Sequence, residues 1–272
     1  TLTWATSTAV ALGPNGGAST AGLPPKYIVA ATTSDDGRSG AQTTTFQYRN
    51  GAQDDQERKF FGFQTVTEFL PKLANEAESP RVIRKFRTDR LAAGRLEEFQ
   101  RWSGLSDNKI LSLTKNEYTT TETTGTGARR KTLLTATWNY QYSGLSGLCT
   151  SWPCADAKRT KVAFTYDNYG NVTQVTNYGD FDTSGDETTT TQSWAPNTSA
   201  YIVGLSAKSM TYAGVGTGGA QIVKSRVLRD GNTLWNQTPT KGDETGTEVW
   251  LNTQDRYITS STNYFAFSPV VQ

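Results

Sequence analysis

The chain has 272 residues, a net charge of +2 and no histidine, and only 35% of its residues are hydrophobic. So balanced a charge gives no basis for nucleic-acid binding. The chain contains no run of about 18 apolar residues, so we predict no transmembrane helix. The missing histidine excludes Ser-His-Asp and Cys-His catalysis and the commonest general base at neutral pH, so we expect a chain that is not an enzyme.

The first 45 residues are rich in Thr, Ser, Gly and Ala and predict two short strands, over 26–30 and 43–48. They contain neither a basic start nor an apolar signal core. The only methionine is Met210, so the chain has no initiator Met. We therefore expect a processed or excised piece of a longer protein.

An aromatic strand follows Asn50-Gly51, a dipeptide that predicts a tight turn. Strict alternation along this strand places Phe61 and Phe63 on one face and Phe60 on the other. Gly62, between the two aromatic residues, is typical of a position that another backbone approaches closely. We therefore interpret Phe61, Gly62 and Phe63 as structural residues.

Residues 81–101 form a basic cluster with interleaved acidic side chains. Val82 and Phe86 have β character and Ala93-Gly94 predicts a turn, so the segment indicates strand, turn, strand. We interpret its charge as a solvated face with cross-strand ion pairs. An anion-binding stripe is the alternative. The basic side chains are Arg81, Arg84, Lys85, Arg87, Arg90, Arg95 and Arg101.

The most informative stretch is 164–172, which has the form of a strand, a tight turn and a second strand. Aromatic and β-branched residues flank a centre that contains Asp, Asn and Gly, which tolerate the dihedral angles of a turn. We predict a hairpin held by Tyr166, Asp167, Gly170 and Asn171.

Alternating patterns separated by Gly-containing turns continue through the second half of the chain, and no long segment shows a 3.6-residue apolar stripe. The fold class predicted is all-β, an antiparallel β-hairpin meander. Strands in this half are predicted at 161–167, 171–178, 188–194, 207–213, 220–229 and 247–260.

One acidic stretch is a candidate calcium site. Asp180, Asp182, Ser184 and Asp186 place oxygen-bearing side chains at alternate positions around Gly185, a spacing that can surround Ca²⁺. The stretch lacks the distal bidentate Glu of an EF-hand, and a polar turn is the other interpretation. No other cofactor is predicted.

Three further groups of residues have two interpretations each. Cys149 and Cys154 either close a small disulfide ring or are two thiols in a loop. The carboxylates at 54–57 are either a catalytic pair or a charged turn. The tryptophans are either sugar-stacking platforms or sheet core. They are Trp102, Trp138, Trp152, Trp194, Trp235 and Trp250.

The Tyr166-Asp167 and Gly170-Asn171 pairs resemble the core of the Rhs/YD-repeat family. Segments 48–63, 86–96 and 194–205 are similar to stretches of that family in the same order. Positions 46–270 together resemble the shell region of B-type subunits of bacterial Tc insecticidal toxins and of SpvB-like secreted proteins. Residues 264–271 resemble a second, degenerate copy of the repeat.

This resemblance implies a curved strip of antiparallel hairpins, one section of a hollow shell that encloses a toxic polypeptide. Residues 1–45 would begin the strip and 46–272 would continue it as a single architecture. The implied partners are other sections of the same shell, further subunits and the enclosed toxin polypeptide. The implied location is outside a bacterial cell, and the implied role is structural.

Two other functions are open. A carbohydrate- or cell-surface-binding β-module predicts several Trp or Tyr rings exposed in a row on one face. A carboxylate-based glycoside hydrolase predicts a cleft with two carboxylates several ångströms apart.

Overall fold

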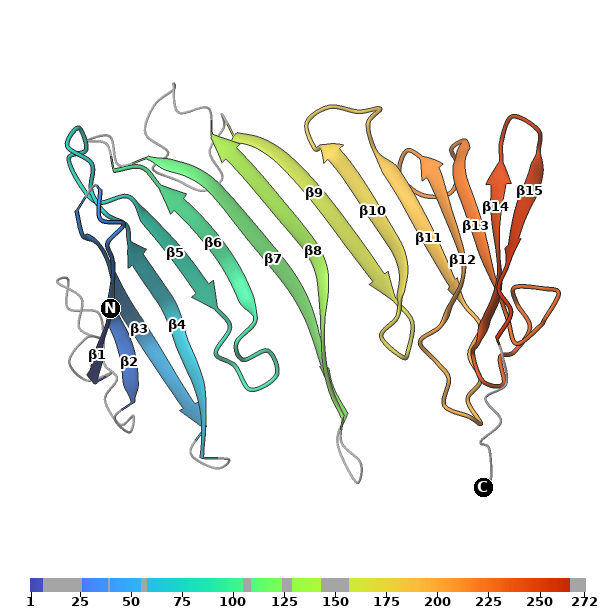
Figure 1. Cartoon of the computed structure of the whole chain (residues 1–272), viewed down its shortest axis with the longest axis horizontal. Helices are drawn as coiled ribbons and strands as arrows, with labels where there is room; N and C mark the ends of the chain where they lie inside the picture. The colour runs from blue at the N-terminus through green and yellow to red at the C-terminus, as the bar shows by residue number, and fades with distance from the viewer. Residues whose placement is uncertain are drawn as a thin grey trace. The chain divides into compact units, whose positions relative to one another are not determined.

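The computed structural model describes residues 1–6, 26–38, 40–54, 58–104, 109–123, 129–142 and 157–264. Within these residues every regular element is a β-strand, and the fifteen strands follow one another in chain order, each antiparallel to the next where the pairing is defined (Figure 1). The predicted all-β antiparallel meander is therefore confirmed. No helix in this part of the chain is long and apolar enough to span a membrane.

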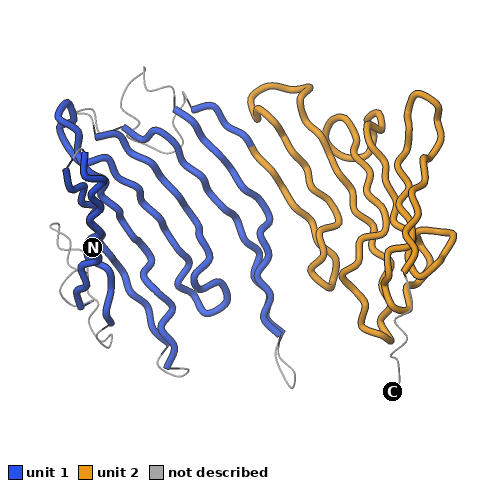
Figure 2. Tube along the Cα trace, in the orientation of Figure 1, with its two compact units in different colours: residues 1–160 blue, residues 161–272 orange. Residues whose placement is uncertain are grey.

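The chain divides into two compact units, residues 1–160 and 161–272 (Figure 2). Unit 1 contains eight complete strands among its described residues and the beginning of a ninth, which continues into unit 2. They are β1 (Leu2–Thr6), β2 (Tyr27–Ser34), β3 (Gln42–Asp54), β4 (Lys59–Phe69), β5 (Arg81–Phe86), β6 (Leu96–Trp102), β7 (Ile110–Glu122), β8 (Arg130–Tyr142) and β9 (Ala157–Tyr166).

Unit 2 continues the same antiparallel pattern. Its complete strands are β10 (Val172–Asp180), β11 (Thr188–Trp194), β12 (Ser206–Ala213), β13 (Gln221–Arg229), β14 (Glu244–Leu251) and β15 (Arg256–Ser261). Because β3 runs through residue 45, the structure has a strand across the expected junction of 1–45 with 46–272, and that division stays a prediction.

Cross-strand rows explain why these residues form a sheet. One row crosses six strands of unit 1, with each member directly opposite the next. Such partners have Cβ atoms about 5 Å apart, so their side chains pack on one face. The row contains Gln47, Thr67, Ile83, Gln100, Leu113 and Tyr140.

The buried core is thin, as the low hydrophobic content predicts. Leu113, Tyr140 and Ala157 form a buried cluster in unit 1, and Trp138 and Tyr142 pack against it. In unit 2 the largest side chains that are wholly shielded from solvent are polar or cyclic, Thr189 and Pro239. These strands are therefore held mainly by their backbone ladders and by contacts along each face.

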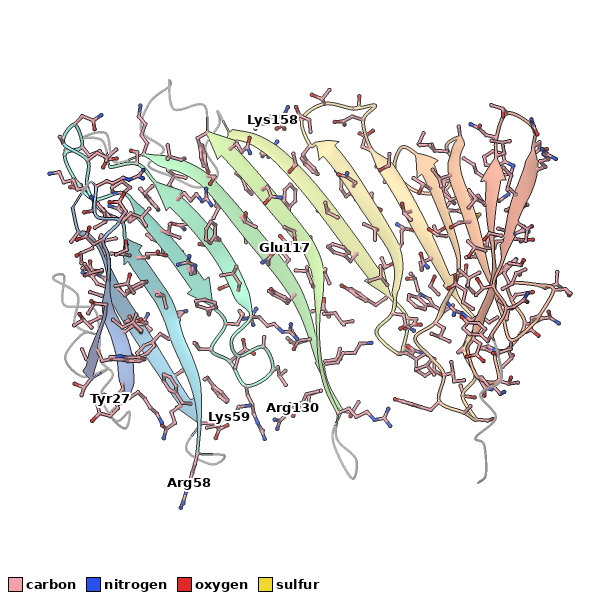
Figure 3. The ribbon with its side chains drawn as sticks, in the orientation of Figure 1. Tyr27, Arg58, Lys59, Glu117, Arg130 and Lys158 are labelled. Carbon is pink, nitrogen blue, oxygen red and sulfur yellow. The ribbon has the colours of Figure 1, made fainter. Side chains whose placement is uncertain are left out.

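The odd-numbered strands of unit 1 all end at one end of its sheet (Figure 1). Figure 3 shows Arg58, Lys59 and Arg130 at this end and Lys158 at the other. Antiparallel pairing of strands in chain order requires this arrangement, because every second strand runs in the same direction.

Two predicted boundaries are wrong. The segment 247–260 is two strands, β14 and β15, joined by a turn at 252–255 in which Asp255 has a φ of +47°. Asn50-Gly51 does not reverse the chain; Asn50 has a φ of +54° inside β3, which continues to Asp54. A left-handed residue within a paired strand produces a local irregularity, and here the pairing with β4 is retained.

Candidate functional site

The β9–β10 turn is held by the side chain of Asp167. Its Oδ1 accepts the backbone N–H groups of Tyr169 and Asn171, both at 2.9 Å, and its Oδ2 accepts the Nδ2–H of Asn171, also at 2.9 Å. Gly170 has a φ of +92°, in the region that glycine alone adopts without strain. The hairpin predicted at 164–172 is confirmed, because Tyr166 ends β9 and β10 follows the turn.

Asn171 also connects this turn to the next connection of the sheet. Its Nδ2 donates to the carbonyl of Val203, at 2.7 Å, in the β11–β12 connection. Burial alone would raise the pKa of Asp167, but the hydrogen bonds from Asn171, Tyr169 and Gly170 outweigh it and lower that pKa. Burial raises the pKa of the Tyr166 hydroxyl. Asp167, Gly170 and Asn171 therefore clamp the loop, and a role of Tyr166 in holding the hairpin stays a prediction.

A second aspartate holds the β5–β6 connection. Asp89 accepts the N–H groups of Leu91 and Ala92 through Oδ1, at 3.1 and 3.0 Å, and the Nε–H of Arg87 through Oδ2, at 2.7 Å. Burial acts to raise the pKa of Asp89, and the bonds from Arg87 and Ala92 outweigh it, so the pKa is lowered. The strand-turn-strand predicted for 81–101 is confirmed, with Gly94 at a φ of +79°.

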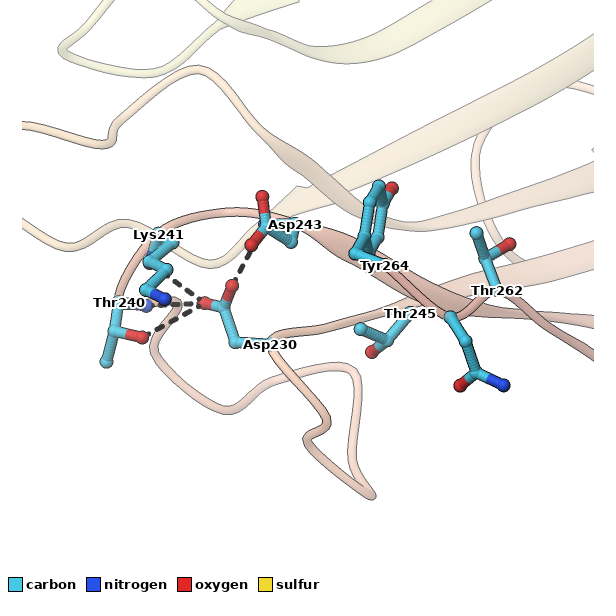
Figure 4. Close-up of a pocket in the computed structure, with 8 residues that line it drawn as sticks. Asp230, Thr240, Lys241, Asp243, Thr245, Thr262 and Tyr264 are labelled. Atoms are coloured by element: carbon cyan, nitrogen blue, oxygen red, sulfur yellow. Dashed lines mark hydrogen bonds between the residues drawn. The ribbon is translucent and has the colours of Figure 1, made fainter. Parts of the chain in front are cut away.

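A third aspartate holds the long β13–β14 connection beside a pocket of about 530 Å³ (Figure 4). Asp230 accepts the N–H groups of Thr240 and Lys241 through Oδ2, at 2.6 and 3.1 Å. Its Oδ1 accepts those of Gly242 and Asp243, both at 2.9 Å. Burial acts to raise the pKa of Asp230, but these four backbone donors lower it to about 2.

The three aspartates follow β5, β9 and β13, so they recur at every fourth strand. Sequence reasoning identified Asp167 and missed the other two as loop clamps. An Asp followed within a few residues by Gly, at 89–94 and 230–231, is the signal that both share. Each carboxylate accepts several N–H groups of its own loop, an arrangement that fixes loop geometry.

The aromatic strand β4 departs from strict alternation at Gly62, which has a φ of +96°. The rings of Phe60 and Phe63 lie in edge contact at 5.4 Å, and Tyr48 lies 5.1 Å from Phe63. The prediction that Phe60 and Phe63 face opposite sides is therefore wrong, because the left-handed glycine interrupts the pleat between them. Lys59 lies 6.0 Å from the Phe61 ring.

Much of the basic cluster of 81–101 is engaged in pairs. Lys85 contacts its cross-strand partner Glu98 at 2.7 Å, and Arg84 contacts Glu68 on β4, also at 2.7 Å. The cross-strand ion pairs predicted for this segment are therefore present. Arg87 pairs within its own loop with the clamp aspartate of the β5–β6 connection.

A polar groove of about 640 Å³ lies on one face of unit 1, over β3 to β6. Its basic lining comes from Arg49, Arg81 and Lys85. The Arg81 guanidinium lies 4.5 Å from the centre of the Trp102 ring, so the ring covers one side of this cation. An anion-binding role for this groove stays a prediction.

Two of the candidate calcium carboxylates accept hydrogen bonds from their own turn. Asp186 accepts the N–H of Asp180 at 2.8 Å, and Asp180 accepts that of Asp182 at 3.3 Å. Asp186 also lies where a side chain on Gly179 would be, so the turn closes tightly. Among the described residues no three acidic, Cys or His side chains form a metal-binding group. Calcium binding through Asp180, Asp182, Ser184 and Asp186 stays a prediction.

Three tryptophans of the described strands use their indole N–H groups internally. Trp102 donates to Gln100 at 3.0 Å, Trp138 to Glu117 at 3.1 Å, and Trp194 to the carbonyl of Val172 at 2.9 Å. All three side chains are half-buried. They fit the interpretation as sheet packing, and the row of exposed rings expected of a carbohydrate-binding face is not formed by these three residues.

Some predicted features lie outside the described residues. These are the cysteine pair Cys149 and Cys154, Trp152, the carboxylates Asp55 and Glu57, and most of the degenerate repeat at 264–271. Asp54 is described, and its Oδ2 lies 3.9 Å from Nε of Arg90.

Comparison with known proteins finds one sequence similarity, over the first 90 residues. A family model described as the insecticide toxin TcdB middle/N-terminal region matches residues 1–90. No curated protein sequence matches the chain.

Solved structures share the fold over nearly the whole chain. The crystal structure of TcdB2-TccC3 is 15% identical, with a TM-score of 0.66, and the match covers 92% of this chain and 18% of that one. The TcdB2-TccC3-Cdc42 crystal structure matches at 15% identity and a TM-score of 0.66, over 92% and 17%. The Photorhabdus luminescens Tc holotoxin pore matches at 15% and 0.67, over 92% and 17%.

The chain thus has the antiparallel β-sheet fold of a region within these toxin complexes, and it spans less than a fifth of the chains that it matches. The family model therefore covers the first 90 residues, and the solved structures share the fold over nearly the whole chain.

Proposed function

We propose that the chain is a non-catalytic, structural section of a secreted, Tc-toxin-like YD-repeat shell that encloses or presents a toxin polypeptide. The observation that carries this proposal is the match of 92% of the chain to the TcdB2-TccC3 structure, at a TM-score of 0.66. The family model over residues 1–90 supports the same assignment from sequence.

The local chemistry supports a structural role. The motif that first suggested function, at 166–171, is a loop clamp, and the same device recurs at Asp89 and Asp230. Carboxylates that accept several backbone N–H groups stabilise loops and have lowered pKa values, as these have. A general acid or base near neutral pH requires a pKa raised toward the working pH.

The faces of unit 2 support contact with further shell sections. Val249 and Ile258 are direct cross-strand partners, and both are about half exposed, at 49% and 54%. Val223, 51% exposed, lies two residues before Ser225, the partner of Val249, and so shares this face. An apolar row of this kind favours burial against another section of the same shell or a further subunit.

Limited proteolysis of the natural full-length protein that contains this sequence, with the subunits that co-assemble with it, tests the proposal. We expect one segment of the assembly to resist a large protease in the native state and to be cut after denaturation. Gly170→Val strains the β9–β10 turn and should reduce this protection, whereas Gly218→Val changes an exposed glycine with nothing within 4 Å and should preserve it. Equal cleavage of every segment in the native and denatured samples would contradict an enclosing role.

A further inference from the structure

Basic side chains gather on one face of β12 and β13. Lys208 and Arg226 are direct cross-strand partners, and Lys224 lies two residues before Arg226, on the same face. We call Lys208, Lys224 and Arg226 the cationic strip. Like charges directly opposite each other on a sheet are destabilising, so the repulsion between Lys208 and Arg226 lowers the stability of the folded chain.

Aromatic rings flank the cationic strip. Lys208 lies 5.0 Å from the centre of the Trp235 ring, and Lys224 lies 5.4 and 5.6 Å from those of Trp250 and Tyr257. Arg226 lies 4.0 Å from the centre of the Tyr257 ring. Each contact at a partly exposed site contributes about 0.5–1 kcal/mol. The rings orient the cations but carry no countercharge.

The strip has more positive than negative charge. Glu248 is the cross-strand partner of Arg226, and their closest charged atoms lie 3.5 Å apart. Within the described residues, Lys208 and Lys224 have no carboxylate within ion-pair distance. Burial lowers the pKa of Lys208, and the positive charges of Arg226 and Lys224 lower it further. The ammonium of Lys208 is therefore destabilised by its neighbours.

Polar atoms at the strip also lack partners. The Nε of Arg226 and the hydroxyl of Tyr257 are both buried, and neither has a hydrogen-bond partner among the described residues. Buried polar groups are paired in the great majority of native structures, so each exception requires an explanation. A bound group that brings negative charge would balance the surplus charge of the strip, and the two buried atoms show that its polar groups are incompletely satisfied among the described residues.

We propose that the cationic strip binds an extended acidic polypeptide segment. Side chains two residues apart on β13, such as Lys224 and Arg226, are spaced by about 6.6–6.8 Å. An extended peptide presents its alternate side chains at the same spacing, so carboxylates at every second residue match the two cations. The flanking rings offer apolar contact to the stems of such side chains.

A peptide fits the strip better than a phosphate group does. Phosphate recognition favours the bidentate fork of a free guanidinium. The guanidinium of Arg226 is stacked on Tyr257 and shared with Glu248, so it can take one more carboxylate contact but presents no free fork to a phosphate. Lys208 and Lys224 are flexible point charges on different strands. This inference does not depend on the shell proposal, since it rests on the strip alone.

Binding of a short synthetic peptide in which glutamate and serine alternate tests the inference, with a peptide of alternating glutamine and serine as its control. Binding is measured by calorimetry and by tryptophan fluorescence, at low and at physiological salt, because Trp235 and Trp250 flank the strip. We expect the glutamate peptide to bind and the glutamine peptide not to bind. Lys208→Gln and Lys224→Gln should each weaken binding about two- to fivefold, the range for a partly exposed ion pair.

Lys72→Gln is the matched control, because it removes one positive charge from an exposed loop position of unit 1. It should leave affinity unchanged. Lys208→Gln should change the melting temperature little, since it removes a destabilising like-charge contact and a stabilising contact with the Trp235 ring together. Equal binding of both peptides, an equal loss in Lys72→Gln, or a loss of affinity that accompanies a lower melting temperature would overturn the inference. Displacement of the peptide by inorganic phosphate beyond that caused by chloride at the same ionic strength would overturn the assignment to a peptide.

Discussion

The carboxylate of Asp230 gives the sharpest single prediction. Asp230→Asn keeps the size of the side chain but replaces one acceptor oxygen with an NH₂ group that faces backbone N–H donors. The pKa of Asp230 falls from 3.8 to about 2 in the folded chain, which corresponds to roughly 2 kcal/mol at about 1.36 kcal/mol per pKa unit. The carboxylate touches solvent, so we discount this to a loss of about 1 kcal/mol.

The pH dependence follows from the direction of the shift. Because the pKa is lowered on folding, the stabilisation is fully present above the ordinary value near 3.8 and is lost as pH falls through about 2. Thermal unfolding by circular dichroism should give Asp230→Asn a melting temperature roughly 2–4 °C below that of the parent chain at pH 7. The difference should shrink as pH falls from about 5 toward 2.

Asp243→Asn is the matched control, since it removes the same charge from the same loop and leaves the acceptor of the four N–H groups in place. It should have a much smaller effect at every pH. Equal melting temperatures for Asp230→Asn and the parent at pH 7, or a difference that persists unchanged to pH 2, would refute the assignment of Asp230 as a loop clamp.

Three further changes test the packing and the turns, each by thermal or chemical unfolding. Gly170→Val should cost about 1–2 kcal/mol because a β-branched residue is strained at a φ of +92°, and Gly218→Val should cost little; equal effects would argue against the turn. Leu113→Ala should cost about 2–5 kcal/mol, since Leu113 is 3% exposed, whereas Leu111→Ala at 45% exposure should be mild; the reverse order would contradict the assigned faces. Thr189→Val should cost about 1–3 kcal/mol, because the fully buried hydroxyl donates to one backbone carbonyl and accepts one N–H; an unchanged free energy of unfolding would show that neither bond matters.

The hairpin architecture was predictable because turn residues and the alternation of side chains, which are short-range sequence patterns, determine it. Gly170 and Gly94 adopt the left-handed φ values that turns require, and both lie where the pattern predicted a turn. Alternation of side chains assigned most of the strands of the second half within a few residues. These features depend on neighbours in sequence, so no tertiary contact was needed to find them.

The errors arose where a local signal was overridden or absent. Asn50 has the left-handed conformation typical of Asn before Gly, yet pairing of β3 with β4 carries the strand through it. The turn before Asp255 contains no glycine, and its aspartate accepts the indole N–H of Trp250 at 3.1 Å. Strand β1 was also missed, since five residues give too short a pattern to recognise.

The clamps at Asp89 and Asp230 and the cationic strip depend on contacts across loops and strands. Asp230 reaches backbone donors ten or more residues further along the chain. Lys208 meets Arg226 only through the register of β12 with β13. Composition and periodicity contain no information on such pairs, which explains why sequence reasoning found the turns and missed the clusters.

The most direct test of the structural role is an experimental density map of the natural full-length protein that contains this sequence, at a resolution that separates strands. We predict that β1–β8 and β10–β15 pair in chain order within a wall one sheet thick, with one face toward an enclosed space. A map in which these strands pack face to face as the solid core of a globule, with no enclosed space, would contradict the proposal that the chain is part of a shell.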